Sequence, residues 1–136
     1  MVVSFLGYAN SVQHIDSGNV SICVSSSNFN LLIDVSGAPI MEMKKAHVDP
    51  MCLSMILLTH SHIDHMYALP SLIHQLWLMG KRDPLIILSN EETIKVAKQL
   101  CEAFSLSQKK GMFTIIWKTI EEGIYLLAST RTIYRF

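Results

Sequence analysis

The sequence has few charged residues and no excess of either sign. Only 16% of its 136 residues are charged, and 11 basic residues balance 11 acidic ones. The basic pairs at 44–45, 81–82 and 109–110 are scattered, as is typical of solvated turns and helix ends. If the protein binds RNA, another part of the assembly must therefore supply most of the positive charge that attracts it. The 50% hydrophobic content excludes general disorder and supports one domain with a sizeable core.

Cysteines and long apolar runs are also scarce. Cys23, Cys52 and Cys101 are odd in number and far apart, which predicts free, mostly buried thiols in a reducing compartment. Residues 1–6 lack the basic start and long apolar stretch of a signal peptide. The apolar segment 66–80 is too short to span a bilayer. We therefore expect a cytoplasmic protein without a membrane partner.

The hydrophobic pattern predicts an α/β protein in which strands and helices alternate. Residues 20–25 show the two-residue period of a half-buried strand, and residues 69–76 show the helical period, with Gly80 as the end of that helix. A capping box at Ser89 to Glu92 predicts a helix that starts at residue 89 or 90. A short helix is expected at 41–46, and strands are expected at 2–6, 20–25, 31–34, 51–58, 85–88, 113–117 and 124–127.

A cluster of metal-binding side chains follows the apolar strand at 51–58. His60, His62, Asp64 and His65 lie within six positions. Imidazole and carboxylate donors suit zinc and neighbouring first-row ions. His60 and His62 project to the same side of an extended segment, while Asp64 and His65 can turn toward a second ion. The spacing predicts a two-metal site that activates water, although four ligands do not fill two coordination spheres.

This motif resembles the signature of the metallo-β-lactamase fold hydrolases. Phe5-Leu6-Gly7 is similar to the family's first strand and glycine turn, and Asp34 is similar to the aspartate of its first conserved motif. Residues 64–72, with the sequence Asp-His-Met-Tyr-Ala-Leu-Pro-Ser-Leu, resemble the ribonuclease Z-like branch. The chain departs from that branch at Ala68, where glycine is usual, and at Ile63, where a small residue is usual.

The resemblance implies half of an αββα sandwich, which is a mixed sheet with helices packed on one face. Residues 1–136 then form the N-terminal half of a metallo-β-lactamase-like domain, and the C-terminal half is absent. That half would carry the third histidine, the bridging aspartate, the last histidine and the arm that grips tRNA.

The resemblance also implies a zinc-dependent phosphodiesterase that acts on precursor tRNA 3′ ends. A complete site would hold two zinc ions, with manganese or iron as other options. His60 and His62 would hold one ion, and Asp64 and His65 would face the other. Asp64 would also be the catalytic residue that orients the nucleophile, and Asp34 would support the loop through hydrogen bonds.

Two interpretations stay open because half of the ligands are missing. In one, a second chain, identical or not, completes the sandwich and its metal site, and the assembly acts on RNA. In the other, the chain is an inactive truncated domain that self-associates through its open apolar sheet face. His47 and His74 are assigned structural or solvent positions. His14, in the loop after the first strand, is also assigned one, although it could reach the site.

Overall fold

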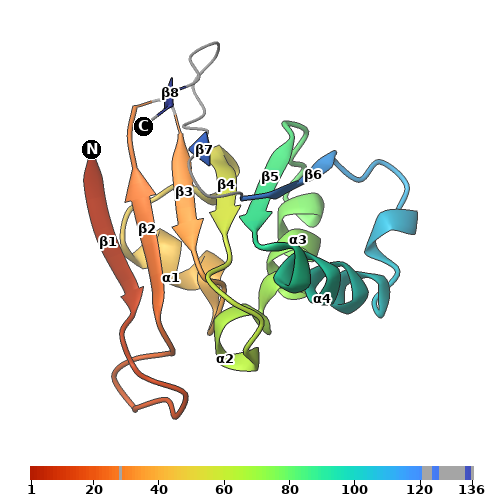
Figure 1. Cartoon of the computed structure of the whole chain (residues 1–136). Helices are drawn as coiled ribbons and strands as arrows, with labels where there is room; N and C mark the ends of the chain where they lie inside the picture. Colours follow the sequence, from red (N-terminus) through yellow and green to blue (C-terminus); the bar gives the residue numbers. More distant parts are fainter. Residues whose placement is uncertain (28, 121–123, 126–133, 136) are drawn as a thin grey trace.

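The computed structural model describes residues 1–27, 29–120, 124–125 and 134–135. Its main feature is a six-stranded sheet with the strand order β1-β2-β3-β4-β5-β6 (Figure 1). The strands β1 to β3 are antiparallel, and β3 to β6 run parallel to one another. The predicted α/β class with a mixed sheet is therefore confirmed. The strand bounds are β1 Val2–Gly7, β2 Ser21–Ser25, β3 Asn30–Ile33, β4 Leu53–Leu57, β5 Leu85–Ser89 and β6 Ile115–Thr119, with a separate pair of β7 Ile124–Tyr125 and β8 Tyr134–Arg135.

The three longer helices form one layer on one face of the sheet. Helix α3 contacts both α1 and α4, and α4 also contacts β5 and β6. Leu72, Ile73 and Leu76 of α3 are fully buried in one apolar cluster with strand residues such as Leu32 and Ile56. The helical period read from the sequence is thus the stripe that packs on the sheet. The helix bounds are α1 Pro39–Lys45, α2 Ile63–Met66, α3 Leu69–Leu78 and α4 Glu91–Glu102, with the 3-10 turns η1 Pro50–Cys52 and η2 Leu106–Gln108.

The opposite face of the sheet is also apolar. Leu31, Met55 and Ile86 are neighbours across the central strands. Because side chains alternate along a strand, these three face away from the helices that cover Leu32 and Ile56. At the β1 edge of this second face, Phe5 is 68% exposed. A sheet that is apolar on both faces is typical of a sheet that is covered by another layer of secondary structure on each face.

Several element boundaries differ from the sequence predictions for local reasons. The strand predicted at 51–58 is shorter because η1 begins at Pro50, where the Asp49 carboxylate accepts the N–H of Met51 at 2.9 Å. The helix predicted at 41–46 begins earlier, with Pro39 in its first turn. Of the strand predicted at 124–127, residues 124–125 are a strand, and 126–127 lie outside the described residues.

The helix predicted to start at residue 89 or 90 has Asn90 as its N-cap. The Asn90 side chain accepts the N–H of Thr93 at 2.8 Å. Ser89 instead ends β5, where its buried hydroxyl donates to the Leu58 carbonyl at 2.7 Å. The last strand of the main sheet lies at Ile115–Thr119, two residues later than the predicted 113–117.

Cys23 and Cys101 are buried free thiols, as predicted, whereas Cys52 is an exposed free thiol. Burial raises the pKa of Cys101 to about 12, which keeps this thiol protonated and unreactive at neutral pH. Within the described part of the chain, no helix has the length and apolar content needed to cross a bilayer. The cytoplasmic compartment stays a prediction.

Candidate metal centre

The predicted metal ligands lie at the carboxyl-terminal edge of the parallel strands. Residues 59–66, which include α2, follow β4, and Asp34 follows β3. The connection between β1 and β2, residues 8–20, reaches the same edge of the sheet (Figure 1). Ligands of open α/β sheets gather at this edge because several loops meet there. We call residues 59–66 the metal loop and residues 8–20 the N-terminal loop.

Asp34 is the buried support of the metal loop. Its backbone is left-handed, with φ of 57°, a conformation that aspartate tolerates better than most residues. Its side chain is 3% exposed. One carboxylate oxygen accepts the N–H of Thr59 at 2.8 Å, and the other lies 2.7 Å from Nδ1 of His65. Asp34 therefore ties together the two ends of the metal loop.

The contact with Asp34 also orients the His65 ring. A carboxylate oxygen accepts hydrogen bonds, so the short contact places a proton on Nδ1 of His65. The second ring nitrogen, Nε2, then lies 3.5 Å from a carboxylate oxygen of Asp64. A carboxylate that holds a histidine by one nitrogen and frees the other is the usual support of a metal-binding imidazole.

His60 and His62 lie beside His65. The ring centroids of His60 and His62 are 4.5 Å apart, and those of His60 and His65 are 4.1 Å apart. Nδ1 of His60 lies 3.0 Å from the hydroxyl of Thr59. The backbone of His62 is the N-cap of α2, but its side chain makes no capping hydrogen bond. The structure thus brings all three predicted imidazoles together with the Asp64 carboxylate.

Asp64 has a partner that the sequence did not reveal. The Ser11 hydroxyl in the N-terminal loop donates to the Asp64 carboxylate at 2.8 Å. This hydrogen bond is the main cause that lowers the pKa of Asp64, against a smaller opposing effect of desolvation. A lone serine 53 residues before its partner carries no spacing signal, so only the fold could reveal the contact.

Tyr67 fastens three segments around the metal loop. Its hydroxyl accepts the side-chain amide of Gln13 at 2.7 Å and the backbone N–H of Gly37 at 2.7 Å. The N-terminal loop, the turn before α1 and the end of α2 therefore share one hydrogen-bonded junction. The prediction singled out the metal ligands and Asp34, and it missed both Tyr67 and Gln13.

The donor set fits a divalent ion in chemistry and falls short in number. Imidazole and carboxylate are the ligands that zinc prefers. However, within the described ranges no group of three or more His, Cys, Asp or Glu side chains is arranged so that it could hold a metal ion. The four predicted ligands also supply two donors for each of two ions, fewer than the three protein groups of a usual catalytic zinc site.

The remaining histidines do not complete the set. His14 is exposed, and its backbone forms a bridge with Ser17 within the N-terminal loop. His47 lines a hollow together with Ser26 and Asp49, beyond the amino-terminal ends of the parallel strands. His74 is half-buried on α3, with its ring centroid 5.5 Å from that of Trp77. His74 thus lies against a ring and lines a pocket, rather than standing free in solvent.

Comparisons with known proteins place this chain among metallo-β-lactamase fold proteins. A family model described as "Anti-Pycsar protein Apyc1" matches residues 1–120. Ribonuclease Z of Methanosarcina mazei is 29% identical over 104 residues, which are 76% of this chain and 33% of that protein. Ribonuclease Z of Pyrococcus abyssi is 34% identical over 80 residues, which are 59% of this chain and 26% of that protein.

Solved structures give the same fold. The short form of human tRNase Z superposes with a TM-score of 0.73 at 19% identity, over 94% of this chain and 56% of that one. A diphosphatase of the PhnP family superposes with a TM-score of 0.68 at 14% identity, over 92% of this chain and 53% of that one. The ribonuclease Z-like resemblance and the metallo-β-lactamase fold are confirmed. The chain spans about a third or less of the two curated relatives and about half of the two solved chains.

Proposed function

The chain belongs to the anti-Pycsar protein Apyc1 family, and from this premise we propose that its metal loop is part of a metal-dependent hydrolase centre that cleaves phosphodiester bonds. The contact between Asp34 and His65 carries this proposal, because one oxygen of a buried carboxylate orients the imidazole through Nδ1. The names of the relatives favour cleavage at phosphorus, since they include ribonuclease Z and a diphosphatase.

In this proposal His60, His62, Asp64 and His65 hold the metal, and zinc is the ion that their chemistry favours over manganese or iron. A bound divalent ion would lower the pKa of water and offset negative charge on the phosphoryl oxygens. Asp64 would orient the attacking water in addition to binding metal. Ser11 keeps the Asp64 carboxylate in place by donating a hydrogen bond to it.

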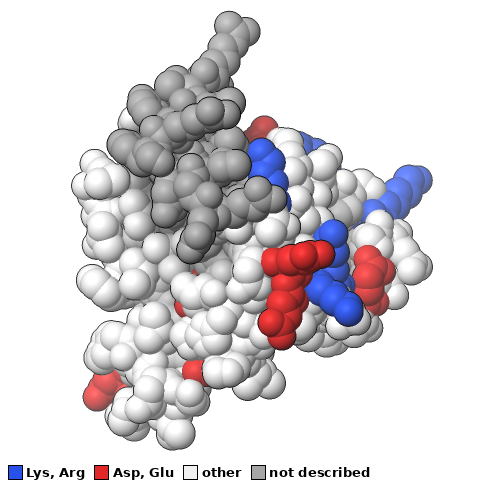
Figure 2. Space-filling view, viewed as in Figure 1, with Lys and Arg blue, Asp and Glu red and all other residues white. Residues whose placement is uncertain are grey.

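Binding of a phosphate-containing substrate requires positive charge near the N-terminal loop and the metal loop. The N-terminal loop, the metal loop and Tyr67 contain no lysine or arginine. On the face shown in Figure 2, no basic side chain lies over these two loops, and charges of both signs gather around α4. The ions would therefore supply the positive charge at this edge. Precursor tRNA 3′ ends are the specific substrate that we propose, with the grip on RNA supplied outside this chain.

A metal and activity assay tests the proposal. The intact chain should bind zinc and hydrolyse bis(p-nitrophenyl) phosphate, and a chelator should remove both properties. His62→Ala should lower the zinc content, whereas His47→Ala, at the other edge of the sheet, should not. Equal zinc content in the two variants would place the ion elsewhere. Cleavage that survives chelation would refute the metal-dependent mechanism.

We also propose that a second copy or a complementary chain completes the sandwich and its metal site. The apolar sheet face opposite the helices supports this proposal, since Val3 and Phe5 at its edge are 52% and 68% exposed. Light scattering after size exclusion should show a species larger than the monomer, and Phe5→Asp should return it to the monomer. A monomer at high protein concentration would contradict self-association.

The inactive truncated domain is the competing function, and the two experiments together separate it from the enzyme. Self-association without zinc binding or cleavage would favour the inactive domain. Zinc-dependent cleavage by the assembly, lost in Phe5→Asp together with the larger species, would favour a site that two polypeptides complete.

A further inference from the structure

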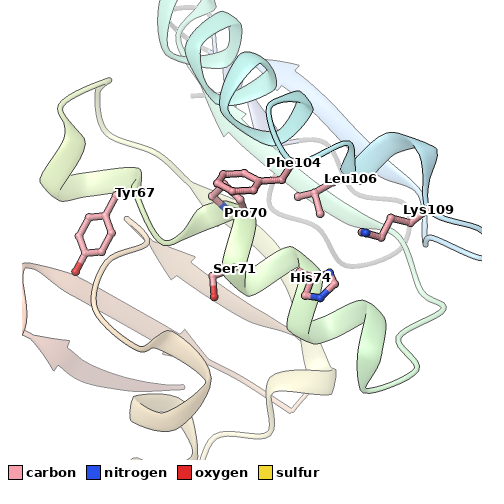
Figure 3. A pocket seen from close by; sticks show the side chains of 7 residues that line it. All are labelled: Tyr67, Pro70, Ser71, His74, Phe104, Leu106 and Lys109. Carbon is pink, nitrogen blue, oxygen red and sulfur yellow. The ribbon is translucent and has the colours of Figure 1, made fainter.

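A pocket of about 310 Å³ lies between α3 and the segment that follows α4. One wall consists of Tyr67 and the first turns of α3, and the other consists of Phe104, Leu106 and Lys109 (Figure 3). The pocket is distinct from the metal loop, but Tyr67 joins the two regions, since this residue lines the pocket and its hydroxyl binds the N-terminal loop. A ligand in this pocket would lie next to the proposed hydrolase centre.

One end of the pocket is an aromatic surface. Phe104 and Pro70 of α3 both line this end, and their side chains overlap in the view of Figure 3. Phe104 is 61% exposed, while Leu106, two residues later, is 2% exposed. Between them Ser105 has a left-handed φ of 50°, which is uncommon for serine, and its N–H donates to the Glu102 carbonyl at 2.8 Å. This turn buries Leu106 while it leaves the Phe104 ring open to a ligand.

The other end of the pocket carries a cation and an imidazole. Lys109 places its Nζ 5.5 Å from the centroid of the Trp77 ring, and the His74 ring centroid lies 5.5 Å from the same ring. Trp77 is itself fixed, because its indole N–H donates to the Lys110 carbonyl at 3.3 Å. The Trp77 ring thus contacts both Lys109 and His74 at the same end of the pocket. Figure 3 shows Lys109 pointing toward His74.

We propose that this pocket binds a nucleotide. The base would stack on Phe104, and the phosphate would accept hydrogen bonds from Lys109 and His74. Stacking on an exposed aromatic ring tolerates any base, and a lysine is a common phosphate partner. The charge is complementary, because none of the seven residues that line the pocket is acidic. The volume lies within the range of small-ligand sites, at its lower end, which suits a single nucleotide.

Calorimetry and NMR of the intact chain with adenosine 5′-monophosphate test this proposal. The titration is made in EDTA, so that a metal ion cannot contribute and the outcome is independent of the proposed hydrolase centre. We expect saturable binding, with amide shifts concentrated at residues 104–109 and along α3. Adenosine and inorganic phosphate should each bind at least about tenfold more weakly than the nucleotide. Equal binding of phosphate and nucleotide would overturn the role of Phe104 and reduce the pocket to an anion site.

Matched variants locate the binding. Lys109→Ala should weaken nucleotide binding about tenfold, as expected for one charge-assisted hydrogen bond, while the neighbouring Lys110→Ala, which removes the same charge outside the pocket, should leave it unchanged. Phe104→Ala should also weaken binding about tenfold, with Leu78→Ala as the control for loss of an exposed apolar side chain on α3. Since Phe104 and Lys109 are not core residues, both variants should fold. The same affinity in Lys109→Ala and Lys110→Ala, or no binding by the unmodified chain at millimolar nucleotide, would refute the proposal.

Discussion

Replacing Asp34 by alanine should destabilise the fold and release the metal loop. The Asp34 carboxylate accepts the backbone N–H of Thr59 and the Nδ1 proton of His65. The Thr59 hydroxyl, its third donor, has Nδ1 of His60 at 3.0 Å as another partner. Two donors are therefore left without an acceptor, at about 1–1.5 kcal/mol each. We expect a loss of about 2–3 kcal/mol in the free energy of unfolding, or about 10 °C in Tm.

Asp34→Asn separates the structural role of this residue from its effect on His65. The asparagine carbonyl can still accept the Thr59 N–H, so the loss of stability should be smaller, at about 1 kcal/mol. Its amide group donates, however, and would favour His65 with Nδ1 as an acceptor and the proton on Nε2. Nitrogen-15 NMR of the imidazole should then report the opposite tautomer. Zinc affinity of the assembled site should fall by about 10–100-fold.

Chemical denaturation tests the predicted loss of stability, and the imidazole spectrum tests the predicted tautomer of His65. Asp49→Ala is a suitable control, because Asp49 also accepts a backbone N–H but lies at the far edge of the sheet. It should leave the His65 spectrum unchanged. The account of Asp34 would be wrong if Asp34→Ala cost less than about 1 kcal/mol, or if Asp34→Asn kept the original His65 tautomer.

Three further predictions concern other parts of the molecule. Gly7→Ala should destabilise the chain by more than about 2 kcal/mol in denaturant unfolding, because a Cβ at Gly7 would overlap the Asn19 carbonyl. Ser89→Ala should cost about 1–2 kcal/mol in the same assay, since it leaves the buried Leu58 carbonyl without its hydroxyl partner, and a change near zero would show that water replaces it. Burial lowers the pKa of Lys81 from its ordinary value of 10.5, so the unfolded chain binds more protons and stability should rise as pH increases toward 10.5. The unfolding free energy of Lys81→Met, measured against pH, should lack this rise.

The sequence predicted the fold well where a hydrophobic period and a local signal agreed. The stripe at 69–76 predicted α3, and the alternation at 20–25 predicted β2, because both patterns follow from which side chains face the core. Predictions were less exact at the ends of elements, where one side chain decides. The sequence left residues 89 and 90 open as the start of α4, and the structure has Asn90 as the N-cap, because the Ser89 hydroxyl donates to the Leu58 carbonyl across the sheet.

The candidate site was predictable where its residues are close in sequence. The metal loop could be identified because its four side chains lie within six positions. Asp34 could be identified only through a family resemblance, since its contacts with the metal loop span 25 and 31 residues. Ser11 and Tyr67 were missed, because a hydroxyl that bridges two loops has no spacing rule. Their roles depend on the tertiary approach of the N-terminal loop to α2.

In the proposed metal centre, the arrangement of the metal edge favours ligands from a further polypeptide segment. Asp34 fixes His65 firmly, but Ser11 and Nε2 of His65 lie near the same Asp64 oxygen, and the His60 ring lies against the rings of His62 and His65. These side chains therefore form one compact group of contacts. In the proposed two-ion centre, four donors would supply only two protein groups for each ion, fewer than the three that a catalytic zinc ion usually has. Ligands from a second polypeptide segment packed on the apolar sheet face would supply the missing donors, which links the proposed assembly directly to the proposed chemistry.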